Sequence, residues 1–212
     1  MACAICETRR PRRFCPGVGG DICTICCGTE REVTVTCPLD CEFLRDARKH
    51  DKPPEIEIAQ VPNQDIRVTE EFLEENELLL GFLGQTVSAA ALGIPGTVDF
   101  DVREALESLI RTYRTLQSGV YYESLSTNPL AASVYAAVQS ATGEFREQER
   151  RRLGMSKTRD ADILGLLVFL QRVEFDRNNG RRRGRAFVDF LKIFYSASPD
   201  PAPGGLSSLI LP

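Results

Sequence analysis

The sequence of 212 residues lacks tryptophan altogether and contains one histidine and two methionines. A single histidine leaves few arrangements for histidine-based catalysis, and no G-x-S-x-G, Walker, dinucleotide-binding or H-E-x-x-H motif occurs. We therefore expect a protein that is not an enzyme. No stretch approaches the roughly 18 consecutive apolar residues that indicate a transmembrane helix. The N-terminal region carries arginines with no apolar run after them, which is not typical of a secretory signal. We expect a cytoplasmic protein that does not insert into a membrane.

The overall composition is that of a folded globular protein. Apolar residues make up 42% of the chain and charged residues 26%. A chain of this length buries enough surface to fold without disulfide bonds. The formal net charge of −4 argues against indiscriminate nucleic-acid binding by the whole chain.

All eight cysteines lie within the first 41 residues. In a chain without an export signal, such clustering indicates metal ligands rather than disulfide bonds. Cys3-x2-Cys6 and Cys23-x2-Cys26 are two close pairs, and sixteen residues separate Cys6 from Cys23, which is the spacing of a four-cysteine zinc site. Two thiolates on one tight turn can both reach an ion about 2.3 Å away, and two such turns complete a tetrahedron.

The other four cysteines predict a second zinc ion. Cys26 and Cys27 are neighbours whose side chains diverge in extended backbone, so we expect them to bind different ions. The first site is then Cys3, Cys6, Cys23 and Cys26, and the second is Cys15, Cys27, Cys37 and Cys41. The sites interleave along the chain, as in a cross-brace module. His50 is an alternative ligand, although a surface position is the simpler interpretation.

The cysteine-rich segment resembles a B-box zinc finger. The resemblance rests on the run Cys3-x2-Cys6-x8-Cys15-x7-Cys23-x2-Cys26, with the segments Arg13-Phe14-Cys15 and Asp21-Ile22-Cys23, and it extends over residues 3–41. It implies a small cross-brace (treble-clef or B-box-like) fold that holds two zinc ions and mediates protein–protein contacts. Members of that family usually close the second site with histidines, where this chain has Cys37 and Cys41.

Pro53 and Pro54 predict a domain boundary, because neither can continue a helix or donate a backbone N–H. The alternating residues 32–36 predict a short strand inside the cysteine-rich module. We expect a zinc module at residues 1–52, a linker with short strands at 53–68, a helical bundle at 69–197, and an extended Pro/Gly/Ser tail at 198–212.

Apolar residues at helical spacing predict an all-α bundle of about five helices after the linker. Thr69 is the expected N-cap of the first helix, Asp101 of the second, and Asn128 of the third, where Pro129 follows at the first helical position. The fourth helix, about 159–176, has almost no polar face, so we expect it in the middle of the bundle. The fifth covers about 183–195.

Two arginine clusters could contact an anion or a nucleic acid. They are Arg9, Arg10, Arg12 and Arg13 in the zinc module, and Arg181, Arg182, Arg183 and Arg185 before the last helix. Arginine at a helix N-terminus is opposed by the helix dipole, which favours an anion or an acidic partner for the second cluster.

The leading hypothesis is a non-catalytic zinc-binding adaptor that binds an unidentified protein partner. The alternatives are a nucleic-acid-binding protein that uses the arginine clusters, and a redox sensor whose thiolates release zinc on oxidation.

Overall fold

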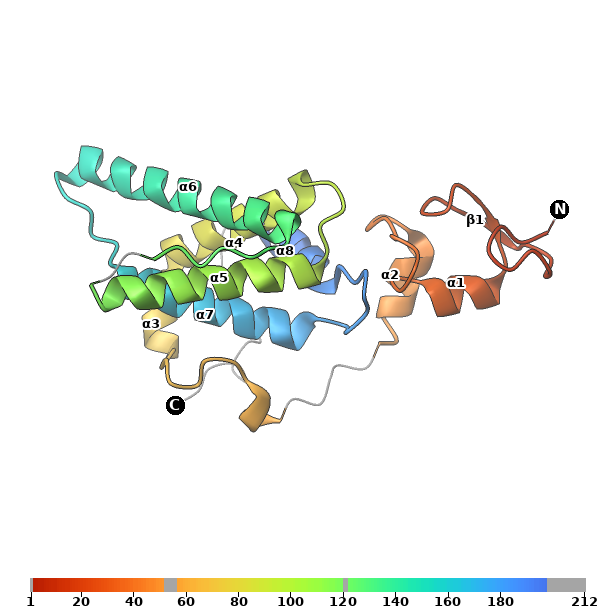
Figure 1. Cartoon of the computed structure of the whole chain (residues 1–212), viewed down its shortest axis with the longest axis horizontal. Coiled ribbons are helices and arrows are strands. Elements are labelled where there is room, and N and C mark those ends of the chain that lie inside the picture. The colour runs from red at the N-terminus through yellow and green to blue at the C-terminus, as the bar shows by residue number, and fades with distance from the viewer. Residues whose placement is uncertain (1, 52–56, 120–121, 198–212) are drawn as a thin grey trace.

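A computed structural model describes residues 2–51, 57–119 and 122–197, and within these ranges the chain forms eight α-helices and one two-stranded sheet (Figure 1). The cysteine-rich module, residues 2–51, lies at one end of a larger helical domain. No helix in the described part of the chain is long and apolar enough to cross a membrane.

The cysteine-rich module consists of a hairpin and two short helices. Strands β1 (Arg13–Cys15) and β2 (Gly20–Ile22) pair antiparallel, and α1 (Thr24–Glu30) and α2 (Glu42–Arg48) follow. The strand predicted for residues 32–36 is wrong. That segment forms a turn instead, in which the N–H groups of residues 33–35 all donate to the Glu30 carbonyl. Glu32 lies in this turn with a left-handed φ of 55°.

The helical domain contains six helices rather than the five predicted. They are α3 (Glu70–Glu75), α4 (Glu77–Gly93), α5 (Asp99–Gln117), α6 (Pro129–Leu153), α7 (Asp160–Arg177) and α8 (Ala186–Ala197). The extra helix arises because the first predicted helix divides at Asn76. The Asn76 backbone N–H and side-chain amide both donate to the Phe72 carbonyl, which ends α3 there.

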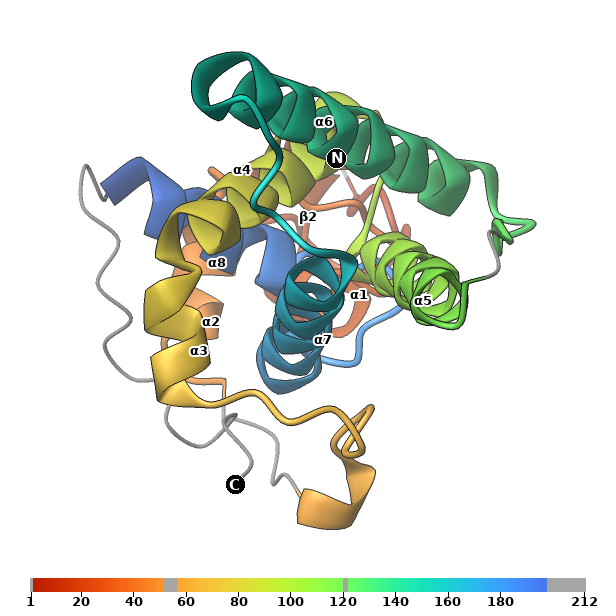
Figure 2. The same ribbon diagram turned by 90° about the vertical axis from the view of Figure 1, so that its left-hand side faces the viewer.

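Helix α7 occupies the middle of the domain, as its sequence predicts. Every residue from Asp162 to Glu174 is buried. In the end-on view of Figure 2, α7 lies between α3 and α5, with α4 and α8 above it and the linker loop below it. A helix without a polar face is stable only when neighbours cover it on all sides, so this burial explains the apolar run.

The predicted caps are confirmed at two of three helices. The Thr69 hydroxyl accepts the Phe72 N–H at 3.2 Å, and the Asn128 side chain accepts the Leu130 N–H at 3.0 Å. The expected N-cap at Asp101 is wrong. The α5 helix begins earlier, after Val98, and the Asp101 carboxylate accepts the Val98 N–H at 2.8 Å from the third helical position.

The linker contains a turn of 3-10 helix at Ile58–Gln60 where a strand was predicted, and the described residues 66–68 form no strand either. The following loop is held by Arg172 of α7, a fully buried side chain whose guanidinium donates to the carbonyls of Pro62, Asn63 and Ile66. Residues 53–56 of the linker and the tail predicted at 198–212 lie outside the described residues.

Candidate metal centre

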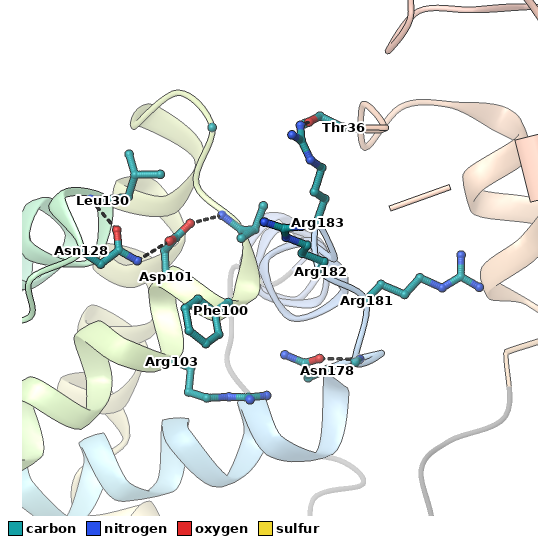
Figure 3. A pocket seen from close by; sticks show the side chains of 13 residues that line it. Thr36, Phe100, Asp101, Arg103, Asn128, Leu130, Asn178, Arg181, Arg182 and Arg183 are labelled. Carbon is teal, nitrogen blue, oxygen red and sulfur yellow. Dashed lines mark hydrogen bonds between the residues drawn. The ribbon is translucent and has the colours of Figure 1, made fainter. Parts of the chain in front are cut away.

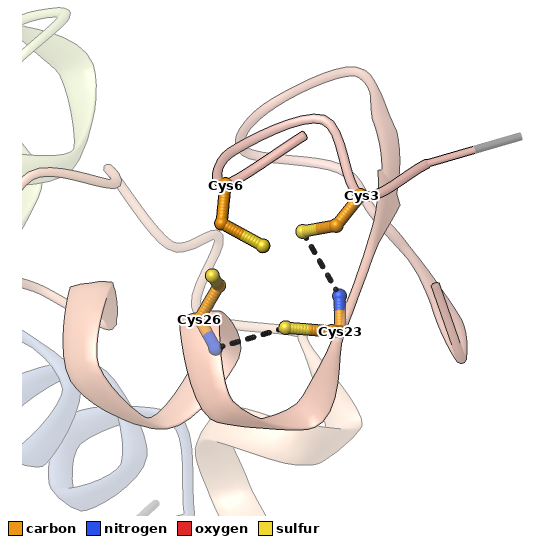
Figure 4. Close-up of side chains that lie close together, drawn as sticks. All are labelled: Cys3, Cys6, Cys23 and Cys26. Carbon is orange, nitrogen blue, oxygen red and sulfur yellow. Dashed lines mark hydrogen bonds between the residues drawn. The ribbon is translucent and has the colours of Figure 1, made fainter. Parts of the chain in front are cut away.

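Four cysteines of the N-terminal module meet in one cluster. The sulfurs of Cys3, Cys6, Cys23 and Cys26 all lie within 4.8 Å of one another (Figure 4). Cys3 and Cys6 come from the N-terminal loop, and Cys23 and Cys26 come from the junction of β2 and α1. The structure therefore brings together the four residues that the spacing assigned to the first site.

Local backbone hydrogen bonds shape both cysteine pairs. Cys23 is the N-cap of α1, and its sulfur accepts the Cys26 N–H at 3.4 Å. The Cys3 sulfur accepts the Cys23 N–H at 3.2 Å, which joins the two pairs. The N-terminal loop is closed by a hydrogen bond from the Glu7 N–H to the Cys3 carbonyl at 2.8 Å. Sulfurs that accept backbone N–H groups are held in a fixed orientation, so the cluster is preorganised.

The electrostatics of the cluster favour a cation. Hydrogen bonds from the Thr8 side chain, and then from the backbone of Thr8 and Arg9, lower the pKa of Cys6 to about 5. Burial, and then the neighbouring thiols, raise the pKa of Cys26 to about 12. Four sulfurs this close cannot all ionise without a positive charge among them, and a metal ion supplies one. A buried set of four cysteine sulfurs fits a soft or borderline ion, so this cluster could hold a metal.

The cysteines assigned to the second site do not form a comparable cluster anywhere in the ranges that the structure describes. They do converge on one place, because all four line a small cavity of about 20 Å³ between the hairpin, α1 and the start of α2. These four residues are Cys15, Cys27, Cys37 and Cys41. Burial raises the pKa of the Cys37 thiol, and the nearby Cys15 and Cys41 also raise it. His50, the alternative ligand, is exposed at the end of the module.

The first arginine cluster divides between the cysteines and solvent. The Cys23 thiol raises the pKa of Arg9 by hydrogen bonding. The Arg13 guanidinium lies 3.9 Å from the centre of the Phe43 ring and 3.8 Å from the Cys27 sulfur. Arg10 and Arg12 are exposed. Two of the four predicted anion contacts therefore interact with thiols of the module itself.

The second arginine cluster contacts the cysteine-rich module. Arg181 donates to the Arg31 carbonyl at 3.0 Å, and Arg183 donates to the Thr36 hydroxyl at 2.7 Å. The Arg185 backbone N–H donates to the Glu32 carboxylate at 3.1 Å. Arg182 is exposed and has no hydrogen bond or ion pair with another described residue.

Sequence reasoning missed Glu32, which joins the module to the helical domain. This carboxylate is 1% exposed. It accepts hydrogen bonds from the Arg48 guanidinium at 2.7 Å and from the Asn179 amide at 2.8 Å, besides that from Arg185. Arg48 also pairs with Asp189 of α8. Nothing in the local sequence distinguishes this glutamate, because Asn179 lies 147 residues further along the chain.

No protein-family model, curated protein or solved structure matches this chain. The resemblance to a B-box finger stays a hypothesis that rests on residues 3–41.

Proposed function

We propose that this protein is a non-catalytic zinc-binding interaction protein, in which a two-zinc module, fixed on a helical domain, presents a protein-binding surface. The observation that carries the proposal is the buried cluster of four cysteines. A catalytic zinc keeps one position for water, whereas four cysteine ligands close the coordination sphere. In the first cluster Cys3, Cys23 and Cys26 are each at most 5% exposed, which is typical of a structural site.

The second zinc ion is supported by the cavity that Cys15, Cys27, Cys37 and Cys41 share. The four thiols share this cavity with other residues, among them Arg13, Phe14 and Arg31, and we propose that an ion draws the four sulfurs together there. The four thiols come from the hairpin, α1, the turn that follows it and the start of α2. A metal ion between them would therefore fasten the whole module together.

The arginines near the thiols also support the proposal of two zinc ions. Four thiolates around a Zn²⁺ ion carry a net charge of −2, which needs partial compensation in a buried setting. Arg9 interacts with Cys23 of the first cluster. The guanidinium groups of Arg13 and Arg31 lie 3.8 and 3.9 Å from the Cys27 sulfur. Cations therefore lie next to a thiol of each proposed site.

Exposed apolar side chains on the module support the interaction role. Phe14 is 59% exposed and Ile25 is 53% exposed, and Val18 and Val33 are also exposed. Exposed apolar side chains that gather on one face mark a protein-binding surface, and we propose that these four residues belong to one.

Metal analysis of the full chain tests the zinc content. We expect two zinc ions per chain in reducing buffer, and one ion each after Cys26→Ser or Cys27→Ser, because the two residues ligate different ions. His50→Ala is the control and should keep both ions. A wild-type content of one ion, or two ions in Cys27→Ser, contradicts the two-site assignment.

A capture experiment tests the interaction role. A partner bound by the wild-type chain should be lost with Phe14→Ser combined with Ile25→Ser. Leu78→Ser is the matched control, because Leu78 is 84% exposed on α4, in the helical domain. If the module variant and the control capture the same proteins in equal amounts, the module does not provide the surface.

A further inference from the structure

A cleft of about 640 Å³ opens between the cysteine-rich module and the adjacent end of the helical domain (Figure 3). Its walls come from Thr36 of the module, the segment 96–103 around the start of α5, the start of α6, and the loop 178–183 between α7 and α8. Neither the cysteine clusters nor the exposed apolar residues of the module use this space.

The cleft carries a surplus of positive charge. Arg103, Arg181, Arg182 and Arg183 line it. Arg103 is neutralised by Glu174, with nitrogen–oxygen distances of 2.9 and 3.1 Å. The other three form no ion pair with a carboxylate in the part of the chain that the structure describes.

A single carboxylate in the lining, that of Asp101, offsets part of this charge. It is already engaged by the Val98 N–H at 2.8 Å and by the Asn128 amide at 2.7 Å. The Arg182 guanidinium is therefore available to an anion from outside the chain, and Arg181 and Arg183 keep N–H groups beyond the one hydrogen bond that each donates to the module.

Two long helices add to the positive potential. Val98 and Phe100 at the start of α5, and Asn128 and Leu130 at the start of α6, all line the cleft. Helix N-termini carry a partial positive charge and favour anions. Both helices run away from the module, so their N-terminal ends meet at the same place (Figure 1).

Apolar residues also line the cleft, next to the arginines. Phe100 is 54% exposed although it lies in the cleft lining, and Val98 and Leu130 line the same space. Figure 3 shows the Phe100 ring between the Asn128 side of the cleft and the arginines. An aromatic ring next to guanidinium groups suits a ligand with an anionic group attached to an apolar or aromatic body.

We propose that this cleft binds a phosphate monoester that carries an aromatic or aliphatic group. Arginine donates to phosphate oxygens through paired N–H groups, and a dianion with three terminal oxygens matches a lining with several guanidinium groups better than a single carboxylate does. A discrete ligand suits the site better than a nucleic acid, because the arginines line one concavity, whereas nucleic-acid-binding proteins carry cations along an extended backbone track.

Calorimetric titration of the zinc-loaded full chain tests the site, with phenyl phosphate as the probe. Arg182→Gln should weaken binding about tenfold or more, because a charged hydrogen bond is lost. This variant leaves the fold unchanged, since Arg182 has no described partner. Arg10→Gln makes the same substitution at an exposed arginine outside the cleft and should bind as the wild type does. Phe100→Ala should abolish the preference for phenyl phosphate over inorganic phosphate.

Three results would overturn the proposal. The first is the absence of any heat of binding at 10 mM phenyl phosphate. A site with several charged hydrogen bonds should have a dissociation constant of about 10 mM or lower. The second is an equal effect of Arg182→Gln and Arg10→Gln. The third is tighter binding of a single-stranded oligonucleotide without a terminal phosphate than of phenyl phosphate, which would assign the cleft to nucleic acid. Metal content is unaffected by either arginine variant, so failure here leaves the zinc proposal standing.

Discussion

Replacing Glu32 by glutamine tests how the cysteine-rich module is fixed on the helical domain. One carboxylate oxygen accepts the Arg48 guanidinium and the Arg185 N–H, and the other accepts the Asn179 amide. Glutamine keeps one oxygen and turns the other into an NH2 group. If the oxygen stays with Arg48, two amide donors face each other at Asn179. The Asn179 side chain cannot simply flip, because its own oxygen accepts the Arg181 N–H at 3.1 Å.

The expected loss in the free energy of unfolding follows from the number of hydrogen bonds that the substitution affects. One buried hydrogen bond becomes a donor–donor contact, which costs about 1–3 kcal/mol. Arg48 loses the charge of Glu32 but keeps Asp189 as a partner. This change adds about 1 kcal/mol to the destabilisation. We therefore expect Glu32→Gln to lower the free energy of unfolding by about 2–4 kcal/mol. Glu32→Ala should lower it by about 3–5 kcal/mol, since alanine removes both oxygens and leaves the Asn179 amide and the Arg185 N–H without their acceptor.

Urea unfolding of the zinc-loaded chain, followed by circular dichroism, measures the effect. Asp46→Asn is the matched control. Asp46 pairs with Lys49 on the same module at 2.8 Å, but both side chains are about 70% exposed, so the change should leave the free energy of unfolding almost unaltered. The reasoning is refuted if Glu32→Gln and Asp46→Asn have the same stability while both retain the wild-type zinc content.

Three further predictions concern the helical domain and the metal. Burial raises the pKa of Asp99 to about 7, above its unfolded value. The contribution of Asp99 to the free energy of unfolding is therefore greatest at low pH and is lost as the pH rises towards 7. In denaturant titrations at pH 5.5 and pH 8, the wild type should lose about 2 kcal/mol of free energy of unfolding relative to Asp99→Asn. Gly81→Ala should raise the melting temperature through helix propensity, because its Cβ meets nothing within 4 Å. Gly84→Ala should lower the melting temperature, because its Cβ would overlap the ring and hydroxyl of Tyr195. Chelation of zinc should remove only the small helical signal of the cysteine-rich module in far-UV circular dichroism, and loss of the whole signal would contradict this expectation.

The helices of the large domain could be predicted because their signals are local. An uninterrupted apolar run predicts helix α7. The N-caps Thr69 and Asn128 each accept a hydrogen bond from a backbone N–H within three residues. The first metal cluster could be predicted for the same reason, since each close cysteine pair forms on one turn. Helices α1 and α2 were missed because each has only seven residues and no apolar stripe, and because α1 is capped by a thiol rather than a hydroxyl or carboxylate.

The features that could not be predicted depend on contacts between distant segments. Glu32 looks like any surface glutamate in the sequence, and its burial follows only when the 178–185 loop folds over it. The arginine-lined cleft is equally nonlocal, since its walls come from segments that begin with Thr36 and end with Arg183. The expectation that the second arginine cluster meets an anion or an acidic partner stays a prediction. The contact of Arg185 with Glu32 comes from the Arg185 backbone N–H and not from its guanidinium.

The position of Glu32 connects the proposed second metal site to the cleft. Glu32 lies between Cys27 and Cys37, two residues of the proposed second site, so an ion held by both would fix the turn that carries it. The same turn anchors Arg181 through the Arg31 carbonyl and Arg183 through Thr36. Arg181 and Arg183 are therefore oriented by the cysteine-rich module rather than by the helical domain to which they belong in sequence. A structural metal in this protein would act at a distance, by holding the guanidinium groups where an anion can meet them, with no bond between the metal and the ligand.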